Sequence, residues 1–316
     1  MKLLFTSIGR RVELVQAFKN AAAKLGVELI LYGADISASA PALQFCDRTV
    51  LVPRIKDPAY IPSLLEVCEK EGIDALIPTI DTDLLVLAEN RERFSAIGTR
   101  AVISAPDRIA LCRDKRLTAD YFHSVGLESP APVDKVEAYI AGYPAFIKPK
   151  DGSSSIFAYK VENQKELEAY AAQIPDYIIQ PFIEGTEYTV DIFCDFEGNP
   201  IFITPRIRLA VRAGEVLKTE ITQDRQIITE MKRLLQDYRP FGPITVQLIR
   251  QKDTGVDYYI EINPRFGGGA PLTMMAGANA AQALLQLLRG EKPTYQEDAA
   301  EDGAIYSRFD QSVRVK

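Results

Sequence analysis

The chain has 316 residues, of which 47% are hydrophobic and 25% charged, and its formal net charge at pH 7 is −6. This length predicts two or three lobes, because a single hydrophobic core rarely supports so many residues. The acidic balance argues against a nucleic-acid partner, and the lack of a long apolar run argues against a membrane protein.

Cysteine and histidine usage narrows the chemistry further. The four cysteines, Cys46, Cys68, Cys112 and Cys194, are scattered without metal-binding spacing. Together with the absence of a signal-peptide pattern in residues 1–5, they predict reduced thiols and a cytoplasmic protein. The only histidine, His123, falls on the wet face of a predicted helix. Zinc sites built on histidine and Ser-His-Asp triads are therefore not expected.

Strands and helices alternate in the first third of the chain. The expected elements are strands at residues 2–8, 27–32 and 75–78 and helices at 12–25 and 61–71. This order predicts a parallel, doubly wound sheet, a Rossmann-like lobe. Gly9 is followed by Arg10 and Arg11 where a dinucleotide fingerprint needs further glycines, so a nicotinamide-type cofactor is not expected.

Polar side chains stand where these strands end, which is where such a sheet binds ligands. Arg10 and Arg11 lie beside a helix N-terminus, an unfavourable place for two cations unless an anion joins them. They are candidates for holding an anionic substrate, with salt bridges as the alternative. Asp81 and Asp83 follow a later strand, and we expect one of them to cap the next helix.

A lysine and a small-residue loop mark the middle of the chain. A helix is expected from about residue 112 to 125, and a short strand then carries Lys148 into Gly152, Ser153 and Ser154. Such a loop can fold over phosphates as a mobile lid while the lysine neutralises them. It is not a Walker A motif, because no Gly-Lys-Ser/Thr closes it. The alternative is an exposed hairpin with solvated lysines.

An apolar linker follows the next predicted strand. The linker residues Gln180, Pro181, Phe182 and Ile183 offer backbone groups that can hold an adenine by its edge, and Glu187 can accept from ribose hydroxyls. Residues 190–194 and 201–207 then predict an antiparallel hairpin around a turn at 195–199.

Basic residues continue at strand spacing after this hairpin, at Arg206, Arg208, Arg212 and Lys218. Such a charged ribbon is usually a solvated face. One arginine of it can instead hold a carboxylate substrate by paired hydrogen bonds, and we select Arg212 for that role.

The most informative stretch is residues 258–269. Alternate residues of a strand share a face, so Glu261, Asn263 and, if the strand persists past Pro264, Arg265 point the same way. Two oxygen ligands beside a fixed positive charge suit Mg²⁺ and a phosphate that it bridges. An edge strand with a polar face is the alternative. A glycine run and an Ala/Leu-rich helix, expected to pack beneath that run, follow.

The order of these parts resembles the ATP-grasp superfamily, as a single unit of the carbamoyl-phosphate synthase large-subunit type. The resemblance implies a Rossmann-like, pre-ATP-grasp α/β lobe at 1–110. An ATP-grasp domain of two α+β subdomains then covers 111–316, with its small lobe at about 111–180 and its C-terminal lobe at about 181–316. It also implies that Lys115 and Lys148 reach phosphates and that Arg265 stabilises the transferred phosphoryl group. Gln247, Glu261 and Asn263 then hold Mg²⁺ or Mn²⁺, with Glu261 bridging two ions. Many family members have an acidic residue in place of Gln247.

The activity implied is an ATP- and Mg²⁺-dependent ligase that activates a carboxylate as an acyl phosphate for attack by an amine or ammonia. The first alternative is a carbamoyl-phosphate synthase-type enzyme that starts from bicarbonate. The second is a nucleotide-binding partner subunit without turnover. The expected partners are small molecules and a possible second copy or partner subunit.

Overall fold

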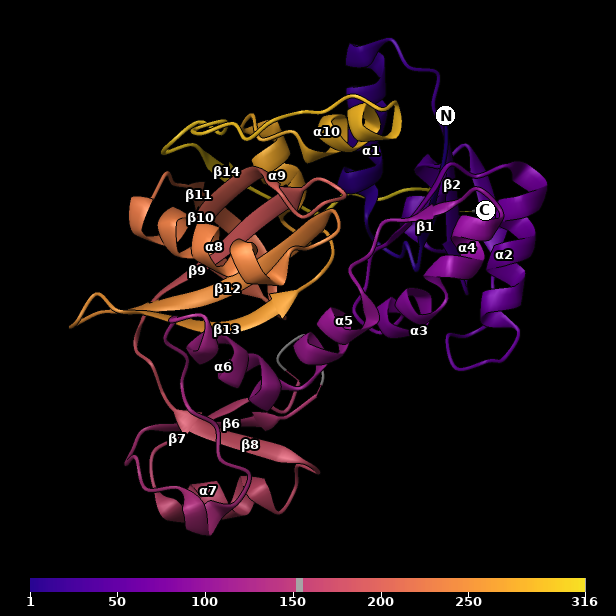
Figure 1. Ribbon diagram of the computed structural model, residues 1–316. Helices are drawn as coiled ribbons and strands as arrows, with labels where there is room; N and C mark the ends of the chain where they lie inside the picture. The colour runs from indigo at the N-terminus through magenta and orange to yellow at the C-terminus, as the bar shows by residue number, and fades with distance from the viewer. Residues whose placement is uncertain (152–155, 316) are drawn as a thin grey trace.

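The computed structural model describes residues 1–151 and 156–315, which form three lobes around three sheets (Figure 1). Gly152, Ser153 and Ser154, and with them the predicted lid, lie outside the described residues.

The N-terminal lobe is the predicted parallel, doubly wound sheet. Its five strands follow the order β3-β2-β1-β4-β5, and every pairing is parallel. The strands are β1 (Lys2–Thr6), β2 (Ile30–Asp35), β3 (Arg48–Leu51), β4 (Ala75–Pro78) and β5 (Arg100–Ala101). The helices are α1 (Val12–Leu25), η1 (Pro41–Phe45), α2 (Tyr60–Glu71), α3 (Leu84–Glu89), α4 (Arg91–Ala96) and α5 (Pro106–Arg113).

The ends of the predicted helices are confirmed by their glycine stops. Helix α1 ends at Leu25 because Gly26 adopts φ 62°, a left-handed conformation that favours glycine. Gly72 ends α2 in the same way, also at φ 62°. The second strand was misplaced, since it begins at Ile30 and runs on to Asp35.

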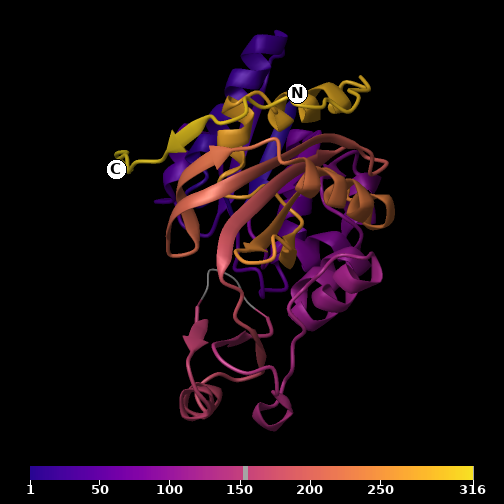
Figure 2. The same ribbon diagram turned by 90° about the vertical axis from the view of Figure 1, so that its left-hand side faces the viewer.

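The small lobe is a three-stranded antiparallel sheet, ordered β7-β6-β8. Its elements are η2 (Val136–Ala138), β6 (Ala145–Pro149), β7 (Tyr159–Val161), α7 (Gln164–Ala171) and β8 (Tyr177–Pro181). In both ribbon views this lobe stands away from the other two (Figure 2).

The C-terminal lobe is built on a six-stranded antiparallel sheet, ordered β13-β12-β9-β10-β11-β14. The strands are β9 (Gly185–Cys194), β10 (Pro200–Arg212), β11 (Glu215–Ile221), β12 (Pro243–Gln251), β13 (Asp257–Asn263) and β14 (Ile305–Ser307). The helices are α8 (Arg225–Tyr238), α9 (Ala270–Met275) and α10 (Ala280–Leu288). The predicted hairpin between β9 and β10 is confirmed, and its turn is fixed by Asp195, which accepts from the backbone of Glu197 and Asn199.

Helix α6 (Lys115–Ser124) packs differently from the predicted division of the chain. We placed it in the small lobe, but Tyr121 and Phe122 belong to the core that α8 forms with β9 and β12. The boundaries at 110 and 180 stay predictions.

A shared core joins the N-terminal and C-terminal lobes. Phe18 of α1 lies edge-on to Phe5 at 5.1 Å and to Phe266 at 5.9 Å between ring centroids, and Phe266 stacks on Phe193 at 6.2 Å. Helix α10 is buried in the same core, against α1, and α9 follows the glycine run directly. This packing fixes the strand ends of the first lobe against the glycine run of the last.

Candidate nucleotide and metal site

A cavity of about 990 Å³ is lined by residues of all three lobes. It collects most of the predicted site residues, namely Arg11, Lys115, Lys148, Gln180, Pro181, Phe182, Ile183, Glu187, Gln247, Glu261, Asn263 and Arg265. These residues are far apart in the sequence, so their meeting in one cavity is a property of the fold.

The sheet of the C-terminal lobe presents one row of side chains to this cavity. The strand register places Arg206 opposite Thr189, Thr189 opposite Gln247, and Gln247 opposite Glu261. All four line the cavity. Asn263 is two residues beyond Glu261 and shares its face, as the alternation in the sequence predicted.

Glu261 and Asn263 form the oxygen-rich end of this row. The Asn263 Nδ2 donates to Glu261 Oε1 at 2.9 Å, which places the carboxylate and the amide side by side. A carboxylate and an amide oxygen are hard donors of the kind that Mg²⁺ and Mn²⁺ take. Their chemistry therefore fits the expected metal. Among the described residues no group of three or more His, Cys, Asp or Glu could hold a metal ion.

Two lysines face this carboxylate from outside the sheet. Lys148, on β6, is 8% exposed. Burial, followed by the neighbouring charge of Lys115, lowers the pKa of Lys148 to about 8, while Glu261 acts in the opposite direction. Burial also lowers the pKa of Lys115, again against the effect of Glu261. A buried and a half-buried ammonium group near one carboxylate favour an added anion such as a phosphate.

Gln247 is already engaged in the structure. Arg208 Nη1 donates to Gln247 Oε1 at 2.9 Å, and Arg208 Nη2 donates to the Gly214 carbonyl at 3.1 Å. The Arg208 Nε lies 3.5 Å from the Glu187 carboxylate. Arg208 was expected in the charged ribbon but not in any role at the site. Its position two residues after Arg206 indicated that both side chains lie on the same face of the strand.

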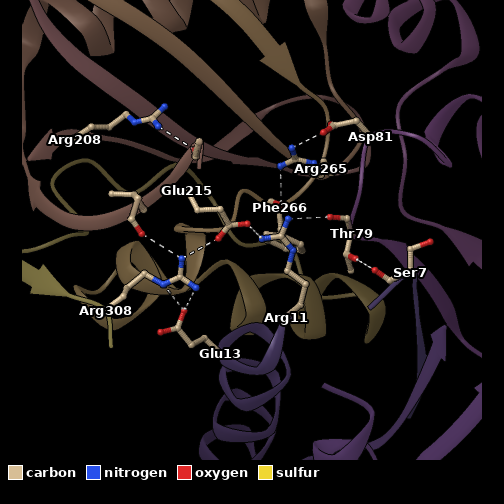
Figure 3. A network of polar contacts seen from close by, with 12 residues as sticks. Ser7, Arg11, Glu13, Thr79, Asp81, Arg208, Glu215, Arg265, Phe266 and Arg308 are labelled. Atoms are coloured by element: carbon tan, nitrogen blue, oxygen red, sulfur yellow. Dashed lines mark hydrogen bonds and ion pairs between the residues drawn. The ribbon is translucent and has the colours of Figure 1, made fainter. Parts of the chain in front are cut away.

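The N-terminal lobe closes one end of the cavity with charged groups (Figure 3). Arg265 Nη2 donates to Asp81 Oδ2 at 2.6 Å, and Arg11 pairs with Glu215 at 3.5 Å. Burial and the charge of Arg265 lower the pKa of Arg11. Strand β13 ends at Asn263, so the alternation of side chains along the strand does not extend to Arg265. The side chain of Arg265 is positioned instead by its hydrogen bond to Asp81.

The expectation that Asp81 or Asp83 caps a helix is wrong. Asp83 is the first residue before α3, yet its carboxylate makes no capping bond. It accepts instead from the hydroxyls of Thr6, Ser7 and Tyr60 at 2.9, 2.9 and 3.2 Å. All three hydroxyls donate to Oδ2, while the buried Oδ1 has no hydrogen-bond partner among the described residues. The three donors therefore hold the carboxylate away from the backbone amides of the helix.

Two predicted substrate residues do not reach the cavity. Arg10 is exposed and does not line the cavity. The Arg212 side chain is 60% exposed and pairs with Asp310 at 3.1 Å. Strand β10 carries Arg212 past the cavity, so Arg206, Arg208 and Arg11 are the described arginines near it besides Arg265.

The predicted adenine linker is positioned by hydrogen bonds to the rest of the small lobe. Gln180 Nε2 donates to the Pro130 carbonyl at 2.5 Å. The Phe182 N–H donates to the Pro144 carbonyl at 3.2 Å, so it is not the free backbone donor that we expected for adenine. All four linker residues, Phe182 included, line the cavity.

His123 and the four cysteines do not line the cavity. His123 is exposed. All four cysteines are free thiols. In the part of the chain that the structure describes, no helix is long and apolar enough to cross a membrane.

Family models match the chain in two places. A model described as "ATP-grasp domain" matches residues 112–269, which is half of the chain. A model described as "PylC-like, N-terminal domain" matches residues 3–103.

Curated relatives and solved structures agree with these matches. The 3-methyl-D-ornithine–L-lysine ligase of Methanosarcina barkeri is 27% identical over 185 residues, covering 57% of this chain and 46% of the relative. The carbamoyl phosphate synthase large chain, N-terminal section, of Aquifex aeolicus is 25% identical over 279 residues, covering 79% of this chain and 49% of the relative. The chain thus spans about half the length of these curated relatives. A biotin carboxylase–ATP complex from Campylobacter jejuni has a TM-score of 0.76 at 16% identity, covering 96% of this chain and 74% of that one, a likeness of fold.

Proposed function

The chain belongs to the ATP-grasp family, and from this premise we propose that it is an ATP-dependent ligase that uses Mg²⁺ or Mn²⁺. It transfers the terminal phosphoryl group of ATP to a carboxylate, releasing ADP, and an amine or ammonia displaces phosphate from the acyl phosphate. One observation carries the proposal. Lys115, Lys148 and Arg265, from separate parts of the chain, line one cavity together with Glu261 and Asn263.

The lysines bind the phosphates of the nucleotide. Burial lowers the pKa of both lysines, and the charge of Lys115 lowers that of Lys148 further. Phosphate oxygens bound beside the two ammonium groups would favour their charged forms. The linker 180–183 holds the adenine, and Glu187 accepts from the ribose.

Glu261 and Asn263 would hold the metal, which when bound neutralises charge on the phosphates. Arg265 is oriented by its 2.6 Å bond to Asp81, so its guanidinium is in place before the reaction. Negative charge that develops on the transferred phosphoryl group is then met by a fixed donor.

Arg11 is the proposed ligand of the substrate carboxylate. It lines the same cavity as Arg265, and burial, followed by the charge of Arg265, lowers its pKa. An anion between the two guanidinium groups removes that repulsion. Arg10 and Arg212 are not proposed for this role.

Bicarbonate is the alternative carboxylate. It is favoured by the match to the carbamoyl phosphate synthase section, which covers 79% of this chain. The product would then be carbamoyl phosphate, formed through carboxyphosphate.

Association of the chain with a second copy or with a partner subunit stays a prediction. Light scattering on the purified chain tests whether it forms a homodimer.

Steady-state ADP release separates these functions. We expect release that requires a carboxylate from a panel of amino acids and related acids, together with an amine. Release that requires only bicarbonate and ammonia supports the alternative. ATP binding with no ADP release under any condition refutes the enzyme and supports a subunit without turnover. The matched control is Glu261→Gln, which keeps the shape of the side chain and removes its charge.

A further inference from the structure

The side chain of Gln247 does not have the surroundings of a metal ligand. Its amide oxygen accepts from Arg208 Nη1 at 2.9 Å. A guanidinium carries only donors, so the oxygen of the amide, not its nitrogen, must face it. The one atom of Gln247 that could bind a cation therefore faces a positive charge.

Arg208 is held firmly in this position. Its side chain is 9% exposed, and its Nη2 donates to the Gly214 carbonyl at 3.1 Å. Its buried Nε makes no hydrogen bond among the described residues, although the Glu187 carboxylate lies 3.5 Å from it. A guanidinium has five N–H donors, so donors remain that can reach an anion in the cavity it lines.

Resting on the proposed function, we propose that Arg208 takes the place of a second metal ion. Its guanidinium supplies to the triphosphate the positive charge that a cation at Gln247 would supply. The chain then binds its nucleotide with one divalent cation, held by Glu261 and Asn263.

The charges of the side chains that the C-terminal sheet presents to the cavity favour a single bound cation. The row Arg206, Thr189, Gln247 and Glu261 contains one carboxylate, and its single negative charge offsets only part of the charge of one divalent cation. Arg206 is paired with the buried Asp191 carboxylate at 2.8 Å. Arg208, the cation beside Gln247, has only the half-exposed carboxylate of Glu187, 3.5 Å from its Nε. A divalent ion at the Gln247 oxygen would lie within a few ångströms of this fixed positive charge, in a site where water screens poorly. The planar guanidinium of Arg208 can bind phosphate oxygens from its present position beside Gln247.

Counting Mn²⁺ on the complete chain tests the proposal. Equilibrium dialysis with a nonhydrolysable ATP analogue, followed by electron paramagnetic resonance, is expected to give one Mn²⁺ per bound analogue and no spin coupling. In Gln247→Leu the Mn²⁺ affinity should change by less than about twofold, whereas loss of a metal ligand lowers it about tenfold or more. The double variant Arg208→Met with Gln247→Glu should bind a second, spin-coupled Mn²⁺. Arg212→Met, the same change on the same strand but outside the cavity, should keep one.

The outcomes are distinct. Two Mn²⁺ ions per analogue in the unaltered chain overturn the inference and leave the ligase proposal standing, whether or not the variants fold. A double variant that still binds one Mn²⁺ overturns the role of Arg208 in excluding the second ion. A chain that retains no analogue overturns the proposed function and this inference together.

Discussion

Lys148 should take up a proton when ATP binds. Burial, and after it Lys115, lower the pKa of Lys148 to about 8 from an ordinary value of 10.5. A bound triphosphate places negative charge beside the ammonium and raises that pKa again. Between pH 8 and 10 the lysine is therefore largely neutral in the empty site and charged in the occupied one.

The magnitude follows from the size of the shift. At 1.36 kcal/mol per pKa unit, keeping Lys148 charged in the empty site costs about 3 kcal/mol. At pH 8.5 roughly three-quarters of the molecules carry a neutral Lys148, so ATP binding should take up about three-quarters of a proton at this residue.

The same shift predicts how stability depends on pH. The unfolded chain keeps the lysine proton up to pH 10.5, whereas the folded chain keeps it only to about 8. Because the unfolded state binds more protons in that window, the contribution of Lys148 to stability rises between pH 8 and 10.5. Lys148→Met should therefore be more stable than the unaltered chain below pH 8, by up to about 3 kcal/mol, and lose that advantage toward pH 10.5.

Calorimetry of ATP binding at pH 8.5, in buffers with different ionisation enthalpies, measures the proton uptake. Lys148→Arg is the control, since a guanidinium does not titrate in this range and the uptake should disappear. Lys115→Arg should keep the part that belongs to Lys148. Equal binding enthalpies in all buffers, or an unchanged uptake in Lys148→Arg, would refute the reasoning.

Three further predictions follow from the same geometry. Glu261→Gln should lower the rate of ADP release by about a hundredfold or more, because it removes the only carboxylate in the cavity row, yet leave much of the nucleotide affinity; near-native turnover contradicts this. Arg265→Lys should lower kcat by about a hundredfold with a much smaller change in KM for ATP. A raised KM with unchanged kcat would limit Arg265 to ground-state binding. Gly269→Ala places a Cβ 2.6 Å from Arg206 Nη2 and should lower the free energy of unfolding in urea by about 1–3 kcal/mol. An unchanged urea midpoint would show that Arg206 moves without penalty.

The sequence determined the elements that depend on local chemistry. Helix α1 was predicted at its exact limits, because its apolar period ends at a glycine that adopts the left-handed conformation. Glu261 and Asn263 were placed on one face, because the alternation of a strand is a local property. The parallel sheet followed from the alternation of strands and helices along the chain.

Only the tertiary structure decided which charges meet. Arg265 lies beyond the end of β13, and its partner Asp81 is 184 residues away in the sequence. The two are brought together because a cluster of aromatic rings joins the N-terminal lobe to the C-terminal lobe. Its members are Phe5, Phe18, Phe266 and Phe193. No local pattern encodes that packing.

The arginines show the same limit most clearly. Their spacing along β10 placed Arg206, Arg208 and Arg212 on one ribbon, and charge alone could not separate them. The cavity extends over only part of that ribbon, so Arg208 reaches Gln247 and Arg212 reaches the exposed Asp310. Sequence period fixes which side chains share a face, whereas the packing of the lobes fixes which of them become buried, and burial decides which charges need a ligand.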